Sequence, residues 1–403
     1  MRQNFGRMIA PLATLLTYQR RTMANTTRND QSTHIAESDA FKAIVDRIAD
    51  AAPAINEQRQ IPDDIIDAMV DQDLFRLLVP KSLGGGEVDF LDYLAVTQAI
   101  AHADGSTAWC FNQNNVLGTN ASLMPEALAK EIWIDGRAIV CNGPPQNVVI
   151  TPVSDGYTVT GRWNFSSGSR HANWVSAAGR LENGDTLLMM IPTAQVEFID
   201  VWHVSGLRGT GSFSFEASNL HVPAERAFVE AQTARDPGPL YKIPRSLLFA
   251  SGFASVGLGV ARAGLDTAID LSLAKTPQEQ IKLKDQAVTQ GQIGHAEAHW
   301  ASANAYLQAT AGTLWANITA GLPLTTHDRI HLRLASTHAI REAVVVVDLA
   351  YTIGGASSIF ESHPIQRRFQ DAHAITQQIQ GRLEHYETAG QFILGLEPQG
   401  RMF

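Results

Sequence analysis

The sequence predicts a mainly helical protein of the α+β class, in which two helical regions flank a region of short strands. Apolar residues recur at helical spacing up to about residue 137, alternate with polar residues to about residue 226, and return to helical spacing after Pro244. The length of 403 residues exceeds that of a usual single core. We therefore expect an amino-terminal extension, a helical domain, a β domain and a carboxy-terminal helical bundle, over 1–35, 36–146, 147–235 and 236–403.

The extension is basic and then polar. Its arginines precede the first acid, Asp30, and flank the short apolar run MIAPLATLL: Arg2, Arg7, Arg20 and Arg21. A weak targeting signal is one interpretation, but no clean cleavage pattern follows. Met23 opens a polar stretch typical of a disordered start. We favour an extended or mis-started amino terminus over export.

Composition narrows the class of protein. The chain is 45% hydrophobic and 18% charged, as expected of an ordinary globular protein, and its net charge of −9 argues against nucleic acid or an anionic membrane as partner. Beyond the extension, no apolar run reaches transmembrane length. The two cysteines, Cys110 and Cys141, lie in apolar surroundings without CxxC spacing. They fit buried thiols in a reducing cytoplasm.

The first helical region is indicated by apolar residues at helical spacing and by the proline and glycine residues between its helices. Ile44, Ile48 and Ala51 recur at helical spacing, and Pro62 precedes the next helix. The glycines of KSLGGGEVDF follow no apolar strand, so we expect a turn and not a dinucleotide-binding loop. Helical spacing then resumes through FLDYLAVTQAIAHADGSTAWCF.

The β region contains short runs separated by DG, NG and PTAQ turns, as in a small antiparallel barrel or sandwich. After Pro244, three long segments rich in Ala, Ser and Gly predict helices that approach one another closely. They suit a bundle and contacts between subunits.

The most informative segment is WNFSSGSRHANW, Trp163–Trp174. Adjacent hydroxyls, aromatic planes and a glycine suit a flat heterocycle, such as a flavin, that needs hydrogen bonds at its edge. The alternative is a β-hairpin whose aromatic side chains only fill a core. The segment alone does not separate these two interpretations.

Three further stretches carry a resemblance to a known family. LFRLLVPKSLGGGEVDF, WHVSGLRGTGSFSFEASNLHVP and YTIGGASSIFESHPIQRRFQDAHAITQQIQ follow one another as in the acyl-CoA dehydrogenase superfamily, which the chain resembles from Asp39 onward. The resemblance implies an N-terminal helical domain, a middle antiparallel β-barrel and a C-terminal four-helix bundle.

Dehydrogenases of this superfamily need a glutamate that removes a proton from carbon. The resemblance implies that this position falls near His373 or Ala374, and no acid occurs between Asp371 and Glu384. The segment 243–264, which could supply it instead, contains no Asp or Glu. Dehydrogenase chemistry is therefore disfavoured.

The same positions resemble the flavin-dependent monooxygenases of this fold, including the oxygenases that act on p-hydroxyphenylacetate, steroid-derived phenols, indole and dibenzothiophene. That branch shows W-x-F-x-S-G-x-x-H-A-x-W, matched over Trp163–Trp174, and R-R-x-x-D-x-H, matched over Arg367–His373. The resemblance implies reduced FMN or FAD delivered by a separate NAD(P)H:flavin reductase, O2 as co-substrate, a C4a-hydroperoxyflavin and a homotetramer. It implies no metal ion, nucleic acid or membrane.

The resemblance also assigns site residues. Ser166 or Ser167 would donate a hydrogen bond to the flavin or its peroxide; strand phase decides which, and the sequence does not fix it. His373 would activate the substrate. The expected cofactor contacts are Phe165, Ser166, Ser167, Gly168, His171, Trp109, Arg208, Lys275, Gly354 and Gly355. Helical spacing, and not the resemblance, places Trp109, Asn112 and Asn115 together, so the expected substrate pocket is Trp109, Phe111, Asn112 and Asn115; relatives often have a histidine on this turn where this chain has asparagines.

For each of these residues the competing interpretation is a purely structural role. The serines would hydrogen-bond the backbone of the turn, His373 would cap a helix, and Gly354 and Gly355 would end a helix. At the level of function, three alternatives remain. Two are enzymes: an acyl-CoA dehydrogenase or oxidase with a relocated base, and an N- or S-oxygenase of the same fold. A non-catalytic flavoprotein is a third. We favour hydroxylation or epoxidation of a small phenolic or indolic substrate, because Trp109, Phe111 and Phe165 are aromatic and no cluster of acids suits an amine.

Overall fold

The computed structural model describes residues 34–230 and 233–400. The chain divides into two units, Met1–His34 and Ile35–Phe403, and every described helix and strand lies in the second. The expected extension over 1–35 therefore lies almost wholly outside the described residues.

The first region is helical, as predicted. Its two central helices, α4 and α5, meet at Asp104, which has extended backbone and whose carboxylate accepts a hydrogen bond from the Thr107 N–H of α5. The elements are η1 (Ile35–Glu37), α2 (Asp39–Gln58), α3 (Asp63–Asp71), η2 (Leu74–Arg76), η3 (Lys81–Leu83), α4 (Phe90–Ala103), α5 (Gly105–Gly118), η4 (Thr119–Ser122) and α6 (Glu126–Trp133).

The β region consists of two four-stranded sheets, ordered β1-β4-β5-β8 and β2-β3-β7-β6. The predicted small barrel or sandwich takes the form of these two sheets, which no strand joins into a closed ring among the described residues. The first strand begins at Val140, ahead of the expected boundary. The elements are β1 (Val140–Asn142), β2 (Pro145–Val153), β3 (Gly156–Ser166), β4 (Trp174–Arg180), β5 (Thr186–Pro192), η5 (Thr193–Gln195), β6 (Glu197–Ile199), η6 (Arg208–Thr210), β7 (Phe213–Pro223), η7 (Ala224–Arg226) and β8 (Ala227–Val229).

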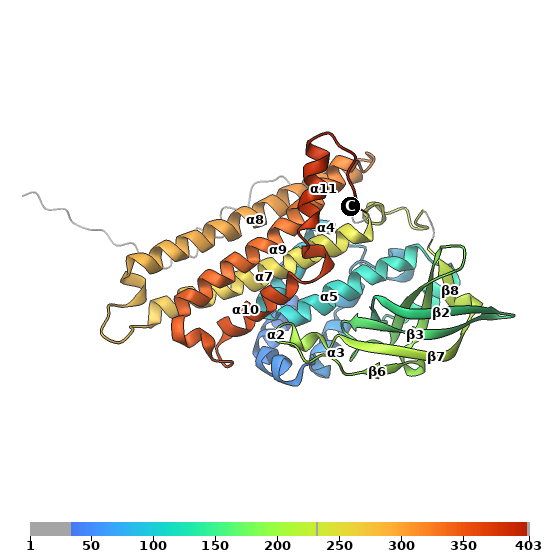
Figure 1. Cartoon of the computed structure of the whole chain (residues 1–403), viewed down its shortest axis with the longest axis horizontal. Coiled ribbons are helices and arrows are strands. Elements are labelled where there is room, and N and C mark those ends of the chain that lie inside the picture. Colours follow the sequence, from blue (N-terminus) through green and yellow to red (C-terminus); the bar gives the residue numbers. More distant parts are fainter. Residues whose placement is uncertain (1–33, 231–232, 401–403) are drawn as a thin grey trace, which may run out of the picture. The chain divides into compact units, whose positions relative to one another are not determined.

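The last region holds long helices that pack side by side (Figure 1). Gly259 of α7 lies so close to α4 that a Cβ there would meet the carbonyl oxygen of Gln98 at 2.4 Å. The small residues of α7 thus permit close helix contact, as expected. The elements are η8 (Pro239–Lys242), α7 (Arg245–Ala274), η9 (Leu283–Asp285), α8 (Ala287–Thr319), α9 (Thr326–Gly354), η10 (Gly355–Ile359), α10 (Pro364–Ile375), η11 (Ile379–Gly381) and α11 (Glu384–Ile393).

Two helical stretches are long and apolar enough to cross a membrane by length and composition, Arg245–Ala274 and Thr326–Ile359. The expectation that no run reaches this length is therefore wrong. In the first stretch, 89% of the most apolar window is buried inside the protein. Its apolar character is that of a core helix.

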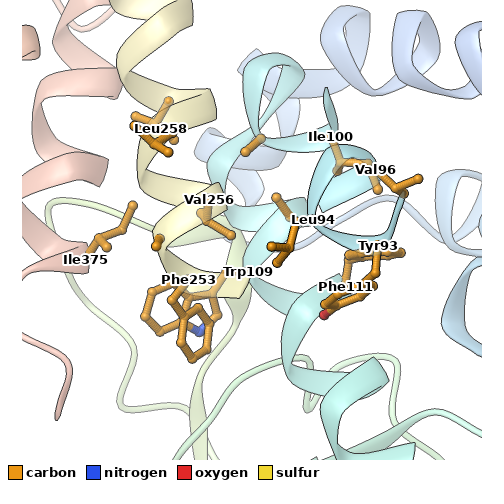
Figure 2. Packing of buried hydrophobic residues seen from close by; sticks show 14 of the residues in the cluster. Tyr93, Leu94, Val96, Ile100, Trp109, Phe111, Phe253, Val256, Leu258 and Ile375 are labelled. Carbon is orange, nitrogen blue, oxygen red and sulfur yellow. The ribbon is translucent and has the colours of Figure 1, made fainter. Parts of the chain in front are cut away.

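The main core joins the first and last regions. Figure 2 shows Trp109 of α5 lying over Phe253 of α7, apart from the pair formed by Tyr93 and Phe111. The Trp109 and Phe253 ring centroids are 3.9 Å apart, and the planes differ by 27°. This stack fixes the helix surface on which the serine-bearing turn rests.

Candidate functional site

The serine-bearing turn follows directly on strand β3. Phe165 has φ +57°, which is unusual for an aromatic residue, and Gly168 has φ +80°. The Phe165 side chain is 63% exposed and meets Trp202 edge to face at 6.1 Å. The reversed backbone at Phe165 turns this ring outward and the following serines inward. Trp202 was not among the residues expected from the sequence, because nothing in WHVS marks it.

Ser166 is fully buried, and its Oγ has no hydrogen-bond partner among the described residues. It lies against Gly143, where a Cβ would come within 2.8 Å of the Ser166 Oγ. A buried hydroxyl without a partner costs free energy, which a ligand's acceptor or donor recovers. Ser166 thus has the character of a ligand-facing group.

Ser167 belongs to a chain of hydrogen bonds. The Trp109 Nε1–H donates to its Oγ at 3.0 Å, and its Oγ lies 2.8 Å from the Ser212 Oγ. The Ser212 Oγ lies 2.7 Å from the Thr210 Oγ1, which donates to the Leu207 carbonyl at 2.9 Å.

The two ends of this chain give it a direction. An indole N–H only donates and a carbonyl only accepts, and each hydroxyl carries one proton. The order is therefore Trp109 to Ser167 to Ser212 to Thr210 to Leu207. The Ser167 hydroxyl proton therefore points to Ser212. For Ser167 to donate a hydrogen bond to a ligand instead, it would have to give up its hydrogen bond to Ser212.

Of the expected pocket residues, the structure brings Trp109 to the serines. Asn112 is buried on the next turn of α5: its Oδ1 accepts from the Tyr93 hydroxyl at 2.7 Å, and its Nδ2 has no partner among the described residues. Asn115 instead bonds the backbone of Leu74, Leu78 and Phe111, and Phe111 stacks on Tyr93. The structure thus does not bring Asn115 and Phe111 to the serines.

His171 lies in the turn after the serines with a nearly buried imidazole. Burial lowers the pKa of His171 to about 4, against the weaker opposing effect of Asp63, whose carboxylate is 3.9 Å away. The ring is therefore neutral at pH 7, able to donate from one nitrogen and accept at the other.

The other residues expected to contact the cofactor, Arg208, Lys275, Gly354 and Gly355, bond to other parts of the protein. Arg208 donates from Nε to the Asn56 carbonyl at 3.1 Å. Lys275 donates from Nζ to the Gly354 carbonyl at 3.1 Å and lies 2.9 Å from the Ser357 Oγ, next to Gly355. Along α7, Phe253 and Lys275 are separated by about 33 Å at 1.5 Å per residue. The expected residues thus form two groups within one chain.

His373 lies on α10 with its Nε2 2.9 Å from the Asp348 Oδ1 of α9, and its side chain is 44% exposed. The structure does not bring it to the serines of the same chain. Asp371, two positions earlier, points about 200° away around the helix, and its buried Oδ1 accepts from the Leu207 N–H at 2.6 Å. The sequence offered no signal that this acid, and not His373, touches the 206–212 loop.

A cavity of about 390 Å³ opens between the end of α5 and the start of α7. Thr119, Ser122, Tyr241 and Arg245 line it, and the Arg245 guanidinium binds Glu230 and Asn120. Leu248 also lines it, and the next residue, Phe249, stacks on Phe253 at 5.9 Å. Sequence reasoning missed this cavity, because single polar residues at helix ends carry no specific signal.

Comparisons with known proteins agree with this architecture. The family "Acyl-CoA dehydrogenase, N-terminal domain" matches residues 33–130, and "Acyl-CoA dehydrogenase, C-terminal domain" matches residues 251–381. Indole-3-acetate monooxygenase from Pseudomonas putida is 32% identical over 90% of this chain and 95% of its own length.

Two further relatives are similar over most of their length. The oxygenase component of the FADH2-dependent resorcinol hydroxylase from Rhizobium sp. (strain MTP-10005) is 23% identical over 91% of this chain and 96% of its own length. The crystal structure of 3-HSA hydroxylase from Rhodococcus sp. RHA1 has a TM-score of 0.84 at 26% identity, covering 92% of this chain and all of that one. The chain belongs to the acyl-CoA dehydrogenase superfamily, in its branch of flavin-dependent monooxygenases.

Proposed function

We propose that the chain is the oxygenase component of a two-component system that uses reduced FMN or FAD and O2 to oxygenate a small phenolic or indolic substrate. The names of the relatives support this substrate class, since they include an indole-3-acetate monooxygenase and a resorcinol hydroxylase. When bound, the reduced flavin would activate O2 and supply one oxygen atom for transfer.

The residues of the serine-bearing turn fit a flavin edge. Ser166 offers a buried hydroxyl without a described partner, and Ser167 offers one held between Trp109 and Ser212. Gly168 allows the left-handed backbone of the turn, with φ +80°. Both serines stay candidates for the hydrogen bond to the flavin, because Ser167 can turn its proton from Ser212 to a ligand. The neutral His171 would border the same turn.

One observation carries the choice of an aromatic substrate. Phe249, Phe253 and Trp109 stack in a row that ends at the Ser167 hydroxyl, and Phe249 follows Leu248, which lines the cavity. Flat faces at this spacing favour aromatic ligands, and stacked pairs contribute about 1 kcal/mol beyond burial. We propose that the Asn112 Nδ2, which has no partner among the described residues, is the donor for a polar substituent.

Lys275, Gly354 and Gly355 are proposed to contact the flavin phosphate of another copy of the chain. They lie about 33 Å from Phe253 along α7, too far to share one flavin with the serines of the same copy. A homotetramer would bring such groups together. We also propose an NAD(P)H:flavin reductase as partner and the cytoplasm as location, which two buried free cysteines suit.

The role of His373 as the residue that activates the substrate stays a proposal of the same kind, since within one copy its imidazole pairs with Asp348. If the histidine acts on substrate, His373→Ala lowers hydroxylation and leaves flavin binding intact. An unchanged hydroxylation rate removes His373 from the mechanism.

The decisive experiment mixes the protein and photoreduced FMN or FAD with O2 and follows the absorbance of oxidised flavin. We expect it to appear after a delay that free reduced flavin does not show, and phenols or indoles to yield product with one added oxygen. Oxidation as fast as that of free flavin, with no oxygenated product, contradicts the proposal. Bleaching of bound oxidised flavin by an acyl-CoA would identify a dehydrogenase instead.

A further inference from the structure

The carboxyl group of Asp371 is buried against the loop 206–212. Only 2% of the residue is exposed, and its Oδ1 accepts the Leu207 N–H at 2.6 Å. When the carboxyl group is ionised, such a hydrogen bond is charge-assisted and about twice as strong as a neutral one. Asp371 is thus a strong anchor for the backbone of this loop.

The loop needs an anchor because its backbone is strained. Leu207 has φ +52°, a conformation that costs a residue with a side chain free energy. The preceding Gly206 touches α10 so closely that a Cβ would lie 2.1 Å from the Gln370 carbonyl oxygen. Such strain persists only where the surroundings hold it in place. Here α10 supplies both the contact surface and the hydrogen-bond acceptor.

The other side of Leu207 leads to the serines. Its carbonyl accepts from Thr210 Oγ1 at 2.9 Å and from Trp202 Nε1 at 3.0 Å. The Thr210 hydroxyl continues through Ser212 to Ser167. A release of the Leu207 N–H from Asp371 therefore moves the carbonyl on which the hydroxyl chain ends.

We propose that Asp371 is a positioning residue for oxygenation, which holds the Ser167 hydroxyl in place through the strained backbone of Leu207 and the Thr210–Ser212 hydroxyl chain. This inference rests on the proposed function, in that Ser167 must border the flavin. The Asp371 carboxyl acts only through other residues and touches neither serine.

The charges around Asp371 make this anchor sensitive to pH. Asp104, from the α4–α5 junction, and Arg367 and Arg368, from α10, are the charged groups that act on it; α7 contributes Asp266 through Arg368. Burial, and then Asp104, raise the pKa of Asp371 to about 7, against the Leu207 N–H and the two arginines. Because a carboxylate binds an N–H more strongly than a carboxylic acid does, the anchor strengthens as the pH rises through 7.

The test compares four single variants, and the double variant Asp371→Leu/Thr210→Val, in the delay of flavin oxidation, measured from about pH 6 to about pH 8. Asp371→Leu removes the acceptor, and Thr210→Val breaks the hydroxyl chain downstream of it. Asp371→Asn keeps an acceptor but no charge. Asp266→Asn is the matched control, since it removes a partly buried acid near Arg368 without contact to the loop.

We expect Asp371→Leu and Thr210→Val each to shorten the delay about tenfold, as the loss of one hydrogen bond predicts. The delay in the double variant should be no shorter than in either single variant, because both changes break the same chain of hydrogen bonds. Asp371→Asn should keep most of the delay and lose its pH dependence. Asp266→Asn should keep the length of the delay, because Asp266 pairs with His102 and Arg262 and does not contact the loop.

Two results overturn the inference. One is a folded Asp371→Leu protein that matches Asp266→Asn; the other is an Asp371→Asn protein that keeps the pH profile of the unaltered chain. If Asp371→Leu fails to fold, Thr210→Val and the Asp371→Asn profile decide alone. An unaltered protein that never delays flavin oxidation contradicts the proposed function, a failure distinct from these.

Discussion

The serine group, made of Trp109, Ser167, Thr210 and Ser212, differs in construction from the lysine group, made of Lys275, Gly354 and Ser357. The first is buried and draws its parts from α5, the turn after β3 and the 206–212 loop. The second is partly exposed, at the ends of α7 and α9, where a lysine donates to the last helical carbonyl.

If both groups bind the flavin, as proposed, they do so in two different ways. In the serine group every hydrogen bond is shielded from water, so the loss of one partner leaves a buried group unpaired at a cost of about 1–3 kcal/mol. In the lysine group, solvent replaces lost partners and salt screens the charge. Variants of the first should therefore affect folding and function together, and variants of the second only ligand binding.

The largest effect is expected from Trp109→Ala, which removes the stack on Phe253 and the donor to Ser167. We expect a loss of about 3–5 kcal/mol in the free energy of unfolding, measured by urea denaturation. Trp109→Phe keeps the ring and should lose much less. A Trp109→Ala protein as stable as Lys275→Ala would erase the contrast between the two groups.

The next effect concerns stability against pH. The pKa of Asp371 is raised from 3.8 to about 7, so between these values the folded state binds more protons than the unfolded state. The contribution of Asp371 to the free energy of unfolding is therefore fully present below pH 4 and is lost as the pH rises through 7. The expected slope is up to about 1.4 kcal/mol per pH unit. Asp371→Asn should flatten the urea-derived profile; an equal slope in both proteins contradicts the assignment.

The two serines should respond differently. Ser167→Ala breaks bonds to Trp109 and Ser212 and should cost about 1–2 kcal/mol of stability. Ser166→Ala removes a hydroxyl without a described partner, so stability should hold or rise. The serine that meets the flavin should also shorten the oxidation delay when replaced. Equal stability losses in both variants would argue against the hydroxyl chain.

The smallest effect is expected in the lysine group. Lys275→Ala should weaken binding of FMN a few-fold and reduce the dependence of its affinity on salt, since one cation no longer faces the phosphate. Thermal unfolding should not change measurably. Lys130→Ala, at a surface pair with Glu126, is the control. If both variants bind FMN alike, Lys275 has no part in the site.

Much of the architecture could be predicted from periodicity and motif order. Helical spacing located α4, α5 and α7, and alternation located β3 and β7, because these elements are long enough to show a pattern. The first strand, Val140–Asn142, pairs in parallel with β4 over only three residues, which is too short for a pattern. The resemblance implied a β-barrel, and the sequence did not show whether its strands close into a ring, because pairing between strands far apart in sequence decides that feature.

The residues of the candidate site could be named from the sequence, but their arrangement could not. The motif Trp163–Trp174 located the serines, but the positive φ of Phe165 interrupts the strand and sets which way each serine points. Likewise, Asp371 and His373 both belong to the R-R-x-x-D-x-H motif, and only the orientation of α10 about its axis decides which side chain contacts the 206–212 loop. Asn115 shares helical spacing with Trp109, yet backbone carbonyls take its amide.

The loop 206–212 has a consequence for how the protein folds. It bonds Asn56 through Arg208, Ser106 through the Gly209 N–H, and Asp371 through the Leu207 N–H. These partners are spread from residue 56 to residue 371, so no local segment can form the loop by itself. Contacts of such sequence separation form late, because the chain between them must first be ordered. The oxygenation site would then be assembled last, and a nascent chain lacking α10 would be folded in part and yet unable to hold a flavin.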